Sequence, residues 1–166
     1  MDRLWAPWRM AYILGDEPKE GTCIFCAYPG DAARHRERLV VHVTDHALVM
    51  LNRFPYNSGH VMVAPRRHVA DPADLPDDEY RALGELVRRA TRVVRAVLAP
   101  EGLNVGMNLG RAAGAGIDAH CHWHVVPRWN GDTNFMPVVG EVKVMAEHLA
   151  ASYDRLRPAF AEAEPS

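Results

Sequence analysis

Residues 120–126 read His120-Cys121-His122-Trp123-His124-Val125-Val126, and the rest of the chain can be interpreted by what this segment needs around it. Three histidines alternate with apolar residues and lead into a β-branched pair, a pattern typical of a β-strand. Because successive side chains of a strand point to opposite faces, the three imidazoles are expected to share one face. Imidazole is the side chain whose ordinary pKa lies nearest to neutral pH. We therefore expect chemistry on this strand and supporting elements around it.

The hydrophobic pattern on either side predicts an α+β domain with an antiparallel sheet, one long helix and a C-terminal helix. The long helix, 77–99, begins with an acidic first turn, carries an apolar stripe at helical spacing and ends before Pro100. The pair Cys23 and Cys26 is expected in a turn. Predicted strands cover 39–43, 47–51, 60–64, 103–109 and 120–126, with a hairpin at 44–46 and a second helix at 142–160.

The composition limits the kinds of partner that the chain is expected to bind. It has 166 residues and a formal net charge of −2, so no global basic field points to nucleic acid as a partner. No stretch approaches the roughly 20 apolar residues of a membrane helix, and the N-terminus lacks a signal-peptide pattern. We expect one domain over 1–166, with an N-terminal arm at 1–20 and a helical extension at 140–166. Three cysteines, an odd number, favour a reducing, cytoplasmic location.

Cys23 and Cys26 form a C-x-x-C pair that is ambiguous by itself. It fits a redox pair, half of a zinc site, or two unrelated thiols. No thioredoxin-like pattern surrounds it, and no second C-x-x-C is present to complete a four-cysteine site. If the pair binds zinc, histidines must supply the remaining ligands.

The three histidines of the strand allow three interpretations. In the first interpretation the three histidines have no common role. This is unfavourable, because buried imidazoles need polar partners. In the second interpretation all three histidines bind one metal ion. This is unfavourable, because His120 and His124 lie roughly 13 Å apart in an extended strand at about 3.3 Å per residue. The third interpretation divides the roles between a nucleophile and neighbours that serve a metal, a proton or a phosphate.

A histidine nucleophile fits attack on phosphorus, because neutral imidazole is nucleophilic near pH 7 and the phosphoramidate is readily discharged. His122 has a neighbour on either side on the same face, so it is the natural nucleophile. Residues 110–116, Gly-Arg-Ala-Ala-Gly-Ala-Gly, directly precede the strand. Their backbone can approach a ligand closely, and their amides can cradle a phosphate, although a small-residue hairpin loop is an equal alternative.

The heptapeptide resembles the signature of the histidine triad family, in which three histidines alternate with apolar residues. The segments LNRFPYNSGHVMVAPRRH (51–68) and NLGRAAGAG (108–116) are similar to the family's ribose-side strand and its loop before the triad. LWAPWRMAYI and PRWNGDTNFMPVVG resemble the longer bacterial branch related to diadenosine polyphosphate phosphorylases and hydrolases. The resemblance covers nearly the whole chain.

The resemblance implies a triad-type antiparallel sheet and a role for each matching residue. His122 would form a nucleotidyl-histidine intermediate on the α-phosphate of an adenine nucleotide. His124 would contact the phosphate and assist the leaving group, and His120 would complete the triad. The remaining implied nucleotide contacts are Asn52 at the ribose, Asn108 at the phosphate and the amides of Gly114, Gly116 and Asp118 in the loop. Arg128, just past the strand, is our own addition, for distal phosphates.

Zinc-containing relatives within the same resemblance imply a ligand set of Cys23, Cys26, His68 and His120, a closed structural Cys₂His₂ site. A homodimer is also implied. Two alternatives remain for the function. One is a uridylyl-type sugar-phosphate nucleotidyltransferase, and the other is a non-catalytic, zinc-stabilised nucleotide-binding module.

Overall fold

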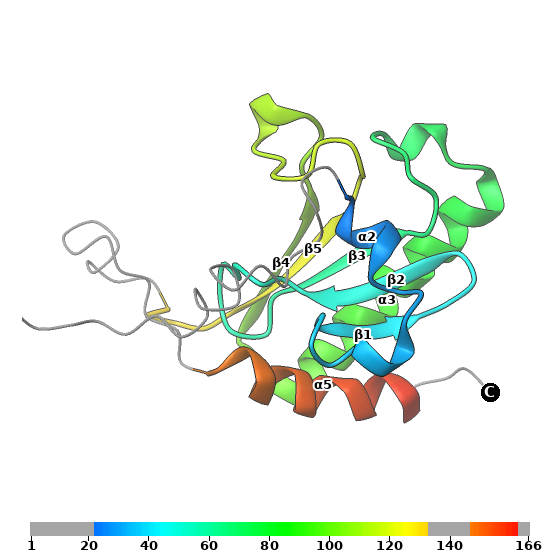
Figure 1. The fold of residues 1–166 in the computed structure, drawn as a ribbon. Coiled ribbons are helices and arrows are strands. Elements are labelled where there is room, and N and C mark those ends of the chain that lie inside the picture. Colours follow the sequence, from blue (N-terminus) through cyan, green and yellow to red (C-terminus); the bar gives the residue numbers. More distant parts are fainter. Residues whose placement is uncertain (1–21, 133–146, 163–166) are drawn as a thin grey trace, which may run out of the picture.

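Five antiparallel strands form one open sheet in the order β1-β2-β3-β5-β4 (Figure 1). The computed structural model describes residues 22–132 and 147–162. The α+β prediction, an antiparallel sheet with one long helix and a C-terminal helix, is confirmed. The strands are β1 (Val40–Val43), β2 (Ala47–Leu51), β3 (Val61–Pro65), β4 (Gly102–Met107) and β5 (Trp123–Arg128), and the helices are α2 (Ile24–Ala27), α3 (Asp77–Leu98) and α5 (Leu149–Glu162).

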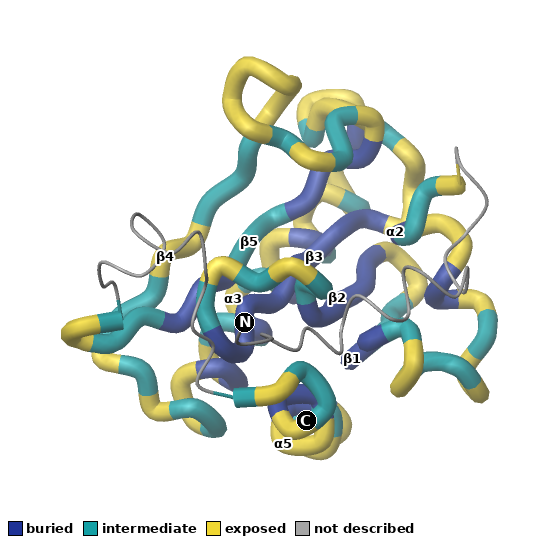
Figure 2. The backbone as a smooth tube through the Cα atoms, turned by 60° about the vertical axis from the view of Figure 1, so that its left-hand side comes forward, coloured by how far each residue is buried: buried dark blue, intermediate teal, exposed yellow. Residues whose placement is uncertain are grey.

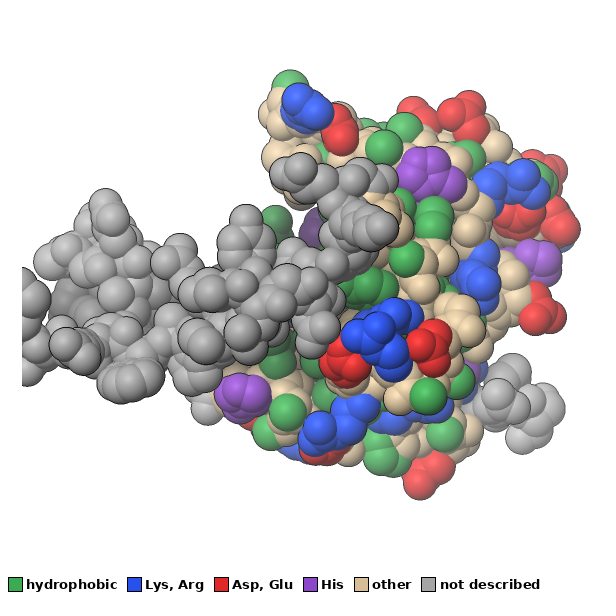
Figure 3. Space-filling view, in the orientation of Figure 1, with side chains coloured by type: hydrophobic (Ala, Val, Ile, Leu, Met, Phe, Trp, Pro, Cys, Tyr) green, Lys and Arg blue, Asp and Glu red, His purple; other side chains and the backbone are tan. Residues whose placement is uncertain are grey.

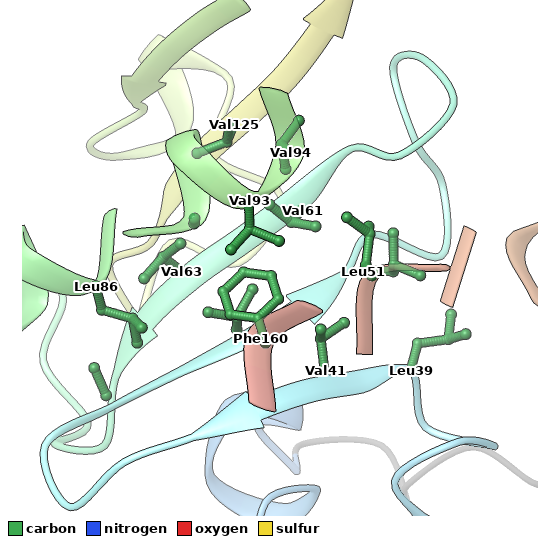
Figure 4. Close-up of a cluster of buried hydrophobic side chains, with 14 of the residues drawn as sticks. Leu39, Val41, Leu51, Val61, Val63, Leu86, Val93, Val94, Val125 and Phe160 are labelled. Atoms are coloured by element: carbon green, nitrogen blue, oxygen red, sulfur yellow. The ribbon is translucent and has the colours of Figure 1, made fainter. Parts of the chain in front are cut away.

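The two faces of the sheet carry two separate apolar clusters, as strand alternation requires. On one face, Leu51 and Val61 pack against α3 and α5 (Figure 4). On the other face, Met50 and Met62 pack against Phe25 of α2. The central strands β2 and β3 are buried along their whole length, whereas the edge strand β4 is partly exposed (Figure 2). The α2 face is the face that carries the site.

Helix α3 covers the other face of the sheet, and it has the features that the sequence predicted for a helix here. It begins with Asp77, Asp78 and Glu79 in its first turn, which favours the helix dipole, and its buried side chains form one stripe. It ends at Leu98, where Ala99 adopts the left-handed conformation before Pro100. The helix therefore ends one residue before the predicted boundary.

The histidine strand begins later than predicted, at Trp123 instead of His120. The ladder to β3 stops at the pair Val63 and Trp123, and the amide of Cys121 donates instead to the carbonyl of Val69 at 2.7 Å. Of the three histidines only His124 lies in the sheet, so the prediction of one continuous strand face was wrong. Arg128, predicted just past the strand, is its last residue.

Several other boundaries also differ from the predictions. The predicted strand 60–64 is shifted by one residue, and the strand predicted over 103–109 ends at Met107. Of the C-x-x-C pair, predicted in a turn, Cys23 is the N-cap of the one-turn helix α2 and Cys26 lies within it. Helix α5 begins at Leu149, not at residue 142, and residues 142–146 lie outside the described residues. The predicted arm, 1–20, also lies outside them, so the domain organisation stays a prediction.

The surface of the described residues mixes both signs of charge. Figure 3 shows acidic and basic side chains side by side on the visible face, in keeping with the net charge of −2. Among the described helices, none combines the length and the apolar character that a membrane crossing needs.

Candidate active site

A cavity of about 410 Å³ opens on the α2 face of the sheet, between α2, β2, β3 and the histidine segment. Its lining combines apolar side chains, most of which are here called the apolar wall, with histidines and polar groups. The apolar wall is made by Ile24, Tyr28, Leu39, Met50, Leu51, Met62 and Ile117. The rest of the lining is Asn52, Arg53, Phe54, Tyr56, Gly116, His122 and His124.

His122 is buried in the cavity lining with one ring nitrogen already occupied. Its Nδ1 lies 2.9 Å from the carbonyl oxygen of His120. A carbonyl only accepts, so Nδ1 carries the proton and the remaining nitrogen, Nε2, keeps its lone pair. Burial lowers the pKa of His122, so the ring is neutral at neutral pH. His122 therefore presents a nucleophilic nitrogen.

His124 has the opposite arrangement because of a fourth histidine. The backbone amide of Tyr56 donates to Nδ1 of His60 at 3.0 Å, so the proton of neutral His60 lies on Nε2. That nitrogen is 2.9 Å from Nδ1 of His124 and donates to it. Burial, with the charge of His122 as the smaller cause, lowers the pKa of His124 to about 4. Neutral His124 then carries its proton on Nε2 and is a hydrogen-bond donor.

His120 is not part of the cavity lining and belongs instead to a cluster of four potential metal ligands. The ligand atoms of Cys23, Cys26, His68 and His120 all lie within 4.8 Å of one another. Nε2 of His120 lies 2.9 Å from the carbonyl of Pro65, which places its proton there and leaves Nδ1 unprotonated, as a ligand requires.

Four spacings within this cluster, between 3.2 and 3.6 Å, are close to those around a tetrahedral ion, and the whole cluster lies within 4.8 Å. Nδ1 of His120 is 3.2 Å from Sγ of Cys23 and 3.6 Å from Sγ of Cys26. The Nδ1 atoms of His68 and His120 are 3.2 Å apart. Bonds of 2.3 Å to sulfur and 2.0–2.1 Å to nitrogen at tetrahedral angles put ligand atoms about 3.3–3.8 Å apart. Two thiols and two imidazoles are also the donors that zinc prefers.

Comparisons with known proteins agree with this geometry. A family model described as HIT domain matches residues 34–131. AP-4-A phosphorylase of Mycobacterium tuberculosis is 40% identical over 155 residues, which cover 90% of this chain and 79% of that protein. The chain belongs to the HIT family. The resemblance predicted from the heptapeptide is thereby confirmed.

Solved structures of the HIT family share the fold. A Zn-bound histidine triad family protein from Mycobacterium smegmatis matches with a TM-score of 0.66 and 30% identity, over 85% of this chain and 94% of that one. Plasmodium falciparum diadenosine triphosphate hydrolase matches with a TM-score of 0.64, over 94% of this chain and 97% of that one. Its sequence identity is 16%, so this second likeness concerns the fold alone.

The predicted nucleotide-binding residues of this HIT protein divide into two groups. Asn52 and Gly116 line the cavity together with His122 and His124. The Asn52 side chain also accepts the Phe54 amide at 2.9 Å, which shapes the rim. The lining does not include the other four predicted residues, Asn108, Gly114, Asp118 and Arg128.

Two of these four residues are held by ion pairs. Asp118 accepts from Arg111 at 2.7 Å across the glycine-rich loop. Arg128 binds both carboxylate oxygens of Asp132, at 2.7 and 2.8 Å, and also donates to Asn104 at 2.7 Å. The structure therefore places Arg128 in a surface network and gives no support to our assignment of this residue to distal phosphates.

Sequence reasoning missed His60, whose side chain is fully buried. The one available signal was a histidine at the start of an otherwise apolar strand, directly after Gly59. Arg53, which lines the cavity, and the α2 residues Ile24 and Tyr28 were also missed. Their participation depends on contacts between segments far apart in sequence.

Proposed function

We propose that this HIT protein transfers a nucleotidyl group from a dinucleoside polyphosphate, such as diadenosine tetraphosphate, through a covalent intermediate on His122. The observation that carries the proposal is the complementary protonation of two adjacent rings in one cavity. His122 offers a lone pair on Nε2, and His124 offers a proton on Nε2. Their ring centroids are 4.9 Å apart.

In the first step, Nε2 of His122 attacks the α-phosphorus. A P–N bond forms while the P–O bond to the leaving nucleotide breaks. The proton on Nε2 of His124 passes to the departing oxygen, so the leaving group does not build up full negative charge. The apolar wall of the cavity suits an adenine ring, and Asn52 lies in the lining where it can contact the ribose.

In the second step, an oxygen of the acceptor bonds to phosphorus while the P–N bond to His122 breaks, and the acceptor's proton returns to Nε2 of His124. With inorganic phosphate as acceptor, diadenosine tetraphosphate gives ATP in the first step and ADP in the second. With water it gives ATP and AMP. The M. tuberculosis relative is named a phosphorylase, which favours phosphate as the acceptor.

The test is incubation with diadenosine tetraphosphate, with and without inorganic phosphate, followed by product analysis and acid-quenched mass spectrometry. We expect ADP and ATP only when phosphate is present, and an adenylyl adduct on the peptide containing His122. His122→Ala should lower turnover by several orders of magnitude while AMP still binds. The exposed residue His46, outside the cavity, supplies a matched control, His46→Ala, which should keep wild-type turnover.

Four results would contradict the proposal. Two molecules of ADP as the sole product would place the attack on the central phosphates. Full turnover of His122→Ala would exclude His122 as the nucleophile. Absence of turnover together with normal AMP binding would favour a non-catalytic nucleotide-binding module, whereas transfer from a uridine diphosphate sugar would favour the uridylyl-type alternative.

We further propose that Cys23, Cys26, His68 and His120 hold zinc. Four protein ligands close the coordination sphere, so a zinc ion there supplies structural stability and no open position for substrate. The Zn-bound M. smegmatis relative supports this proposal.

A further inference from the structure

The segment 23–28, here called the Cys23–Tyr28 turn, presents three different sides to the molecule. Its core is the four-residue helix α2, which has no side-chain N-cap hydrogen bond. A single helical turn has little stability by itself, because nucleation fixes several residues for one hydrogen bond. The position of the turn therefore depends on what each side contacts.

The first side is the ligand side. Cys23 and Cys26 contribute two of the four donor atoms of the metal cluster, and Nδ1 of His68 lies 3.4 Å from Sγ of Cys26. The other two donors come from His68 and His120, which are distant in sequence. An ion in this cluster therefore joins the turn to two other segments of the chain.

The second side is part of the cavity wall. Ile24 and Tyr28 line the cavity, and they belong to the same apolar cluster as Met50 and Met62 of the sheet. Any displacement of the turn moves two side chains of the surface on which a nucleobase would lie.

The third side meets the proposed nucleophile. Phe25 is fully buried, and its ring centroid lies 4.9 Å from that of His122 and 5.1 Å from that of His120. One residue of the turn thus contacts both the ligand ring and the nucleophilic ring.

We propose that the Cys23–Tyr28 turn couples the metal cluster to the cavity, so that occupancy of the cluster by zinc sets the affinity for the nucleobase end of the substrate. The inference rests on the proposed function, because it concerns the same cavity. The cysteines act here as positioning residues. The sheet has an independent core against α3 and α5, so the effect is confined to the turn and the cavity wall.

The experiment compares the zinc-loaded full chain with the same protein stripped by a chelator and with the stripped protein after zinc is restored. AMP binding is measured by calorimetry, and backbone hydrogen exchange is measured by mass spectrometry. We expect stripping to raise the dissociation constant for AMP at least tenfold and to speed exchange in residues 23–28, while β2 and β3 keep their protection. Restored zinc should reverse both changes.

A matched pair of variants distinguishes the effect of losing the metal from the effect of changing the cavity wall. His68→Asn removes a ligand that lies neither in the turn nor in the cavity lining, so it should weaken AMP binding as stripping does. His46→Asn makes the same change at an exposed histidine outside the ligand set and should leave AMP affinity and zinc content unchanged.

The outcomes are distinct. Equal AMP affinity in the loaded and stripped proteins would overturn the coupling and show that the packing of Phe25 suffices to hold the turn. Loss of protection in β2 and β3 on stripping would overturn its local character. If the zinc-loaded protein bound no AMP, the proposed function would fail, and exchange in residues 23–28 would still show whether the cluster holds the turn.

Discussion

At the scale of single residues, the three triad histidines differ because each has one ring nitrogen bound to a different partner. A backbone carbonyl sets the proton position in His120 and in His122. In His124 a second histidine, itself oriented by the Tyr56 amide, sets it. Identical side chains thereby differ in proton position, in the way that the proposed roles of ligand, nucleophile and proton donor require.

His60→Leu tests this assignment at the residue that orients His124, because leucine offers no hydrogen-bond donor to His124. Without the imidazole donor, Nδ1 of His124 is free to carry the proton, and Nε2 loses its donor role. We expect turnover of diadenosine tetraphosphate to fall about 10²–10⁴-fold, the usual contribution of a general acid. A p-nitrophenyl ester of AMP, whose leaving group needs no proton, should lose much less. An equal loss with both substrates, at an unchanged melting temperature, would assign His60 a merely structural part.

At the scale of elements, the loop between β2 and β3 is tied to the turn that follows β5. Asn57 donates to the carbonyl of Pro127 at 3.1 Å and to Asp132 at 2.8 Å. The amide of Trp129 also donates to Asp132. The same loop carries cavity-lining residues, including Asn52, so the network holds that side of the cavity from outside.

Asp132 makes this network sensitive to pH in a defined direction. Hydrogen bonds from Arg128, followed by the Trp129 amide, lower the pKa of Asp132 to about 2. An unfolded aspartate has a pKa of about 3.9, so its contribution to stability is present above that pH and is lost as the pH falls towards 2. The urea midpoint of Asp132→Asn should therefore lie below that of the wild type at pH 6, and the difference should shrink by pH 2.5. A constant difference would contradict the shifted pKa.

Element boundaries show what sequence patterns can and cannot provide. Helix α3 and strands β1 and β2 were predicted within one residue, because their apolar patterns are local. The start of β5 was missed because the Cys121 amide bonds to Val69, a partner 52 residues earlier that no local pattern reveals. The same limit applies to the site. The resemblance predicted the triad and a ligand set, whereas His60 and the cavity residues of α2 could be found only from the fold.

At the scale of the whole molecule, the two edges of the sheet differ. Helix α5 packs beside β1, and the Tyr153 hydroxyl donates to the carbonyl of Val40. Among the described residues, no strand pairs with the outer edge of β4. Val105 on that strand is 42% exposed, and Leu109 just beyond it is 44% exposed. An open edge with apolar side chains is a site at which another strand can add.

The predicted homodimer would use this edge, with β4 of two copies pairing. Val105→Lys introduces a charge of the kind that blocks edge pairing in natural sheets. We expect light scattering to give twice the chain mass for the wild type and the monomer mass for the variant. A wild type that is monomeric at all concentrations, or a variant that stays dimeric, would exclude pairing through β4.

The register of β5 also has a consequence for how this protein can vary. His124 pairs across the ladder with Met62 on the cavity face, while the adjacent Val125 is buried on the opposite face. One inserted or deleted residue in this strand would exchange the two faces, placing an imidazole in the core and a valine in the cavity. Insertions and deletions between residues 123 and 126 should therefore be absent from active homologues. The loop at 110–116, by contrast, can change length without altering the ladder.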